Sequence, residues 1–148
     1  MKKIKVKPER AVLIAAFLLP VVLMLFLFMI KQIYPFGDRS FLSGDLYHQY
    51  MPFFSELFHK VRGGESLNFS FHTGIGSNFL ALFAYYLASP FHVLGLITGE
   101  AHLVEFLGYI VVIKTGFCGL TACIYFQKHF NTKDFAVLLF SMFYAFSG

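Results

Sequence analysis

Charged residues are scarce in this sequence. Asp, Glu, Lys and Arg fill 14% of its 148 positions, whereas hydrophobic residues fill 57%, with 21 Phe and no Trp. A soluble domain usually carries about 25% charged residues. Because too few charges remain to cover a globular surface, the composition excludes an ordinary soluble domain. It predicts a protein whose solvent is largely the lipid bilayer.

Cysteine is also scarce, and its placement excludes several kinds of site. Cys118 and Cys123 lie in one apolar run, at a spacing that fits no Cys-x-x-Cys redox or metal pattern. Both are expected to be small residues of an apolar core. The six His residues show no ligand spacing either, so no metal site of the zinc-protease kind is predicted.

The positive charge is concentrated at the N-terminus. Basic residues before position 11 supply most of the formal net charge of +4, and they are Lys2, Lys3, Lys5, Lys7 and Arg10. No alternation of basic and aromatic residues follows them, so nucleic acid is not a predicted partner. A basic cluster before an apolar run is instead typical of a cytoplasmic N-terminus.

Residues 11–30 contain no charge and are predicted to cross the membrane. About 20 apolar residues, rising 1.5 Å each, match a hydrocarbon core about 30 Å thick. We place the span at about 11–33. Pro20 lies within it, but a helix in lipid tolerates a proline. A cleaved signal peptide is the alternative, but the sequence that follows, Gln32–Pro35, is too bulky for a cleavage site.

Residues 34–102 are predicted to form a long loop outside the membrane. Apolar residues recur at helical spacing and predict an amphipathic helix over 50–62, ended by Gly63 and Gly64. The other face of this helix is expected to be polar, with Ser55, Glu56, His59, Lys60 and Arg62. The apolar face is expected to lie either in the bilayer interface or against the protein's own membrane helices.

A second apolar segment, 79–97, is interrupted by Ser89 and Pro90. If 79–97 and the later run 103–126 both crossed the membrane, the basic loop 127–134 would lie outside, against the usual bias of Lys and Arg toward the cytoplasm. We therefore expect 79–97 to be interfacial or re-entrant and 103–126 to be the second span. Residues 127–134 are then a cytoplasmic loop, and a third span begins at 135.

Asp45 is the residue whose place best suits chemistry. It lies in the outer loop before the amphipathic helix, where a carboxylate can act as a general base toward an acceptor hydroxyl. Asp is also a preferred helix-capping residue, so capping or plain solvation stays open for Asp45 and Asp38. Lys114 lies in the middle of the second span, where a charge is energetically costly, which suggests a contact with a lipid phosphate. The alternative is that its side chain snorkels to the membrane surface. The predicted substrate-binding residues are Asp38, His48, Gln49, Tyr50 and Lys114.

Four stretches together resemble the N-terminal region of the bacterial YfhO family of membrane proteins. They are GDLYHQYMPFF at 44–54, GGESLNFSFHTGIGSNF at 63–79, YYLASPFHVL at 85–94 and FYAFSG at 143–148. The resemblance implies an all-α, polytopic fold similar to the GT-C glycosyltransferases. Those enzymes place a catalytic Asp in a first outer loop that also bears membrane-parallel helices, and Asp45 matches this place.

The resemblance further implies a bacterial cell membrane enzyme that transfers a sugar from a polyprenyl-phosphate donor. The acceptor would be a cell-envelope polymer such as lipoteichoic acid, on the outer face. No cofactor beyond this donor is implied, and participation of a divalent metal stays open. The 148-residue chain is expected to be the N-terminal part of a longer protein and inactive alone. The alternatives are a non-catalytic transporter, flippase or envelope-assembly protein, and a small structural anchor.

Overall fold

The computed structural model describes residues 8–132 and 134–147, which form helices joined by turns, with no β-strand in these ranges. This confirms the all-α prediction for the described part of the chain. The chain divides into two compact units. Unit 1 comprises Met1–Gly37 and Val111–Gly148, and unit 2 comprises Asp38–Ile110. The basic residues up to Lys7, and Lys133, on which the predicted orientation rests, lie outside the described residues.

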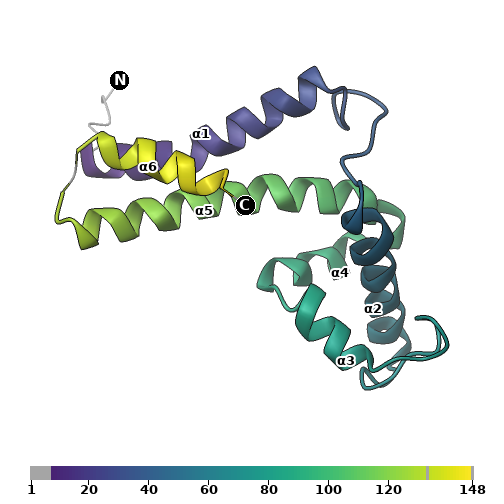
Figure 1. Ribbon diagram of the computed structural model, residues 1–148. Coiled ribbons are helices and arrows are strands. Elements are labelled where there is room, and N and C mark those ends of the chain that lie inside the picture. The colour runs from purple at the N-terminus through teal and green to yellow at the C-terminus, as the bar shows by residue number, and fades with distance from the viewer. Residues whose placement is uncertain (1–7, 133, 148) are drawn as a thin grey trace, which may run out of the picture. The chain divides into compact units, whose positions relative to one another are not determined.

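Unit 1 is built from three helices. They are α1 (Pro8–Ile30), the part of α5 (Leu103–His129) that follows Ile110, and α6 (Ala136–Ala145). Within this unit α1 and α5 run antiparallel, and α6 lies along α1 (Figure 1). The two helices expected as spans are therefore packed against each other.

Glycine on α5 allows α1 to approach closely. A Cβ built on Gly119 would lie 2.3 Å from the Ala16 carbonyl oxygen, and one on Gly116 would meet an α1 side chain at 2.6 Å. Small residues at such contacts are typical of helix packing in membranes. Cys123 is fully buried beside Ala16 in this core, as expected, whereas Cys118 is exposed and does not belong to it.

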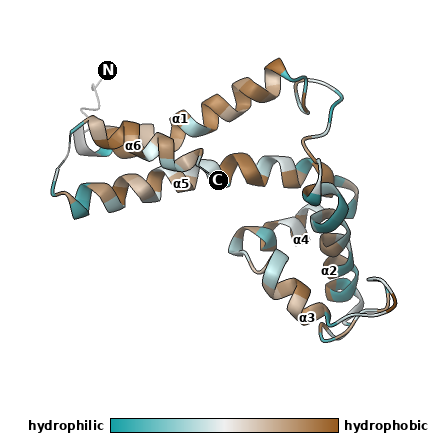
Figure 2. Ribbon diagram, in the orientation of Figure 1, coloured by the Kyte–Doolittle hydropathy of each residue, from teal (hydrophilic) through white to brown (hydrophobic). Residues whose placement is uncertain are grey.

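The outer surface of unit 1 is apolar, as contact with lipid requires. On α1, Val22 and Ile30 are each 57% exposed, and hydrophobic colouring covers most of α1 and α6 (Figure 2). Two helices in the described ranges are long and apolar enough to cross a membrane, Arg10–Ile30 and Glu100–His129. A third, α6, is apolar but shorter.

Unit 2 is organised around α2 (Met51–Gly63). A π-helical turn, Leu46–Tyr50, leads directly into α2, and Gly64 ends it in the left-handed conformation at φ 66°. Burying a Phe or Leu side chain contributes about 1.5–3 kcal/mol. The buried core holds eight such residues and one Ile: Leu42, Phe54, Leu57, Phe79, Leu87, Leu103, Phe106, Leu107 and Ile110.

Residues 79–98 form two helical segments, which we call the bent pair. The first, Phe79–Leu87, contains α3 (Phe79–Leu82), and the second, Pro90–Thr98, contains α4 (Gly95–Thr98). Their axes differ by 104°. The bend follows from proline, because Pro90 lacks an N–H donor and forces Ser89 into an extended conformation. Counted as one broken span, the pair raises the number of candidate spans to three. Its interfacial or re-entrant position stays a prediction.

The elbow of the bent pair satisfies its own backbone groups. The Ser89 N–H donates to the Leu87 carbonyl at 2.7 Å, and the His92 N–H donates to the Ser89 carbonyl at 2.9 Å. The His92 Nδ1 also lies 3.1 Å from the Leu87 carbonyl oxygen. His92 is only 4% exposed, so its imidazole serves as an internal cap for the broken helix.

Candidate functional site

Asp45 lies on the surface of unit 2, at the residue before the π-helical turn. Its backbone is helical (φ −63°, ψ −29°), and its side chain makes no capping hydrogen bond. The carboxylate instead accepts a hydrogen bond from the side-chain amide of Gln49, with Oδ1 3.2 Å from Nε2. Asp45 is therefore not the helix cap that its residue type allowed.

The Gln49 amide also connects Asp45 to the bent pair. Its Oε1 accepts a hydrogen bond from the Tyr86 hydroxyl, 37 residues further along the chain. The Tyr86 ring packs edge-on against Tyr50, with centroids 5.1 Å apart, and at a tilt against Phe53, with centroids 5.2 Å apart. The structure thus brings Asp45, Gln49 and Tyr50 together. Sequence reasoning missed Tyr86, because no local pattern pairs it with them.

The remaining predicted substrate-binding residues are not joined to this group. His48 is exposed and lies edge-on to the ring of Tyr47 at 5.3 Å. Asp38 is exposed at the start of unit 2. Within the described ranges no hydrogen bond or ion pair links either residue to Asp45. Lys114 is half-buried on the part of α5 that belongs to unit 1.

An apolar cavity of about 470 Å3 lies between α2 and the bent pair. Its walls include Leu57 and Val61 of α2 and Leu87, Val93 and Leu96 of the bent pair. A cavity with this lining takes hydrocarbon groups more readily than charged ones.

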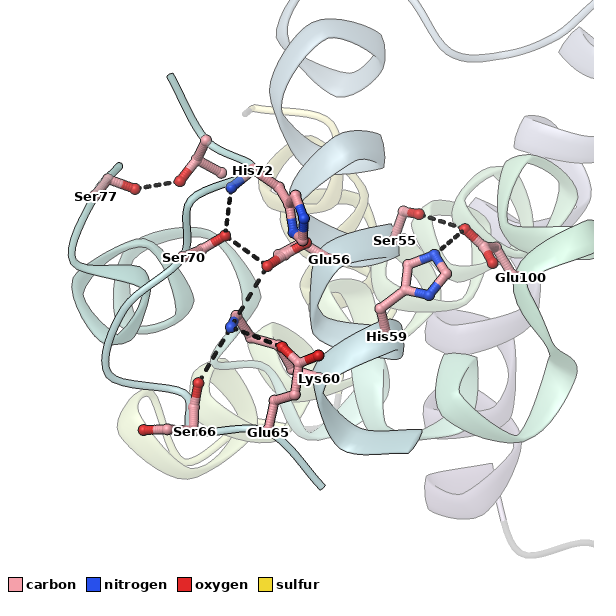
Figure 3. Close-up of polar contacts among 11 residues, drawn as sticks. Ser55, Glu56, His59, Lys60, Glu65, Ser66, Ser70, His72, Ser77 and Glu100 are labelled. Atoms are coloured by element: carbon pink, nitrogen blue, oxygen red, sulfur yellow. Dashed lines mark hydrogen bonds and ion pairs between the residues drawn. The ribbon is translucent and has the colours of Figure 1, made fainter. Parts of the chain in front are cut away.

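A second polar group in unit 2 is centred on Glu56 (Figure 3). The Ser70 hydroxyl donates to Glu56 Oε1 at 2.5 Å, and His72 Nδ1 lies 3.0 Å from Oε2. Lys60 Nζ lies 3.5 Å from Oε1. Glu56 is 7% exposed and Lys60 is 4% exposed, so these two residues of the polar face of α2 are buried rather than in solvent. The loop after α2 covers them, which helical periodicity cannot reveal.

Burial and hydrogen bonding act in opposite directions on Glu56. Burial, the largest single effect, raises the pKa of its carboxyl group, but hydrogen bonds from Ser70 and His72 and the charges of His72 and Lys60 lower it. The net result is a pKa below the ordinary value of 4.5. Lys60 also donates to the Ser66 carbonyl at 3.2 Å and pairs with Glu65 at 3.5 Å. The group therefore fastens the loop to α2 with both buried charges paired.

Neither polar group of α2 is arranged as a nucleophilic triad. Such a triad needs a serine hydroxyl hydrogen-bonded to the histidine ring, whereas the Ser70 hydroxyl is bonded to Glu56. On the other side of α2, Ser55 and His59 both contact Glu100 Oε1, at 2.5 and 3.0 Å (Figure 3). The described residues also contain no group of three or more His, Cys, Asp or Glu side chains that could hold a metal ion. Asp45, with Gln49 and Tyr86, forms a third polar group of unit 2, and its carboxylate is exposed.

Comparison with known proteins places these observations in a family. The family described as bacterial membrane protein YfhO matches residues 15–148. No curated protein and no solved structure matches the chain.

Proposed function

The chain belongs to the YfhO family of bacterial membrane proteins, and on that premise we propose that it forms part of a GT-C-like membrane glycosyltransferase. The reaction is transfer of a sugar from a polyprenyl-phosphate donor to a cell-envelope acceptor such as lipoteichoic acid. The protein is multi-pass with a cytoplasmic N-terminus, which puts unit 2 on the outer face. The two candidate spans and the N-terminal basic cluster support this orientation.

Asp45 is the general base of this proposal. The observation that carries it is an exposed carboxylate that caps no helix and has one oxygen fixed by Gln49. The hydroxyl proton of the acceptor passes to Asp45, and the hydroxyl oxygen forms a bond with the anomeric carbon of the sugar. The bond between that carbon and the phosphate oxygen breaks, which releases polyprenyl phosphate. A positioned base of this kind contributes about 10²- to 10⁴-fold to a rate.

The remaining binding roles follow from the chemistry of the side chains. Tyr50, beside Gln49, offers a ring and a hydroxyl to a sugar, and Asp38 and His48 offer further hydrogen-bonding groups. The apolar cavity between α2 and the bent pair suits the first isoprene units of the donor. Lys114 is a proposed contact for lipid phosphate, because an ionisable group at membrane depth is energetically costly and is therefore a candidate for a functional role.

The test is the sugar content of the cell envelope in cells that carry the full-length gene. Asp45→Asn keeps the size of the side chain but removes its basicity, so one sugar decoration should fall by about 100-fold or more. Asp134→Asn is the matched control, since Asp134 is an exposed carboxylate outside the site. Unchanged decoration in Asp45→Asn, with the protein present in the membrane, would instead favour a transporter or an assembly protein.

A further inference from the structure

We propose that Tyr86 is a positioning residue for Asp45 and that it acts through the amide of Gln49. This inference rests on the proposed role of Asp45 as the general base. The two ends of one amide carry it: Oε1 accepts from the Tyr86 hydroxyl, and Nε2 donates to Asp45 Oδ1 at 3.2 Å.

The charge of Asp45 fixes the direction of both hydrogen bonds. An ionised carboxylate only accepts hydrogen bonds, so the amide must turn its NH2 group toward Asp45. The amide oxygen then points to Tyr86, and the phenol has to donate. With the amide reversed, an amide oxygen would face the carboxylate, and the two would repel. By donating to that oxygen, the Tyr86 hydroxyl holds Gln49 in the orientation that the ionised carboxylate requires.

Tyr86 is itself held in place from several sides. Its ring contacts Tyr50 and Phe53, which lie on the π-helical turn and on α2. The next residue, Leu87, is 1% exposed in the core of unit 2 and anchors the backbone. Without these contacts, an exposed carboxylate on a short turn would populate several rotamers. The bent pair therefore supplies the rigidity that the turn around Asp45 lacks.

The experiment measures the initial rate at which the Asp45-dependent sugar decoration appears after induction of the full-length gene, per amount of protein in the membrane. The variants are Tyr86→Phe, Gln49→Met, the double variant, and Asp45→Asn. Tyr85→Phe is the matched control, because Tyr85 is the adjacent tyrosine and is 80% exposed. Loss of one neutral hydrogen bond should slow Tyr86→Phe by about 3- to 10-fold, while Tyr85→Phe should equal the wild type.

A positioning role that acts through Gln49 predicts non-additivity. Gln49→Met keeps the length of the side chain without its amide, so Tyr86→Phe should cause no further loss in that background. A wild-type rate in Tyr86→Phe overturns the proposal. Rate losses that multiply in the double variant also overturn it, since Tyr86 then acts independently of Gln49. So does a Tyr86→Phe protein that fails to accumulate, since the role of Tyr86 is then only structural. A wild-type rate in Asp45→Asn overturns the proposed function itself, whatever the tyrosine variants show.

Discussion

Glu56→Ala removes the carboxylate that binds Ser70, His72 and Lys60, and we expect it to lower the free energy of unfolding by about 3 kcal/mol. The Ser70 hydrogen bond is buried and only 2.5 Å long. A hydrogen bond to a charged group contributes about 1.5–3 kcal/mol. The His72 side chain is 75% exposed, so solvent screens its contact and its share is below about 1 kcal/mol.

Lys60 decides the rest of this estimate. Leaving a buried charge without its partner costs about 3–5 kcal/mol. Lys60, however, keeps Glu65 and the Ser66 carbonyl as partners in the variant. Lys60 is therefore not left fully unpaired, and the expected loss in the free energy of unfolding stays near the lower end of the range of about 3–5 kcal/mol.

Far-UV circular dichroism of the purified protein in detergent measures this loss, because unfolding removes helix from an all-α chain. Glu65→Ala is the control, since the Glu65 side chain is 58% exposed. A contact at that exposure contributes at most about 1 kcal/mol. If Glu56→Ala and Glu65→Ala destabilise the protein equally, Glu56 does not fasten the loop and the reasoning is wrong.

Three further predictions concern pH, helix packing and lipid contact. Folding lowers the pKa of Glu56 below 4.5, so the ionised carboxylate stabilises the folded protein above pH 4.5. This stabilisation should be lost as the pH falls through the lowered pKa of the folded state. Unfolding measured as a function of pH should show the loss in the wild type but not in Glu56→Ala. Gly119→Val should weaken the packing of α1 on α5 by about 1–3 kcal/mol in the same unfolding assay, whereas Thr121→Val, at an exposed position of α5, should change it by less than about 0.5 kcal/mol. Lys114→Gln should reduce sugar incorporation by about tenfold, as expected for loss of one charged contact to phosphate, whereas the exposed Lys128→Gln should not; equal effects would exclude a specific role for Lys114.

The long helices were predictable, because a run of twenty uncharged residues leaves the backbone few alternatives in lipid. The amphipathic spacing likewise located α2 to within a residue at each end. The interruption of residues 79–98 was also predictable, since Pro90 cannot continue the helix before it.

The polar contacts that join residues far apart in sequence were not predictable. Glu56 meets Ser70 after 14 residues, and Gln49 meets Tyr86 after 37. Periodicity identifies which residues of a helix are polar, but it does not reveal which loop will cover them. For Asp45, residue type alone favoured capping or solvation over catalysis, and only the structure showed that its side chain makes no capping hydrogen bond.

The elbow of the bent pair has a consequence for how the protein is made. Its hydrogen bonds join Leu87, Ser89 and His92, which are at most five residues apart. These contacts can form while the chain is still being synthesised, before α5 has left the ribosome. The hydrogen bonds of this bend need no residue of any later helix.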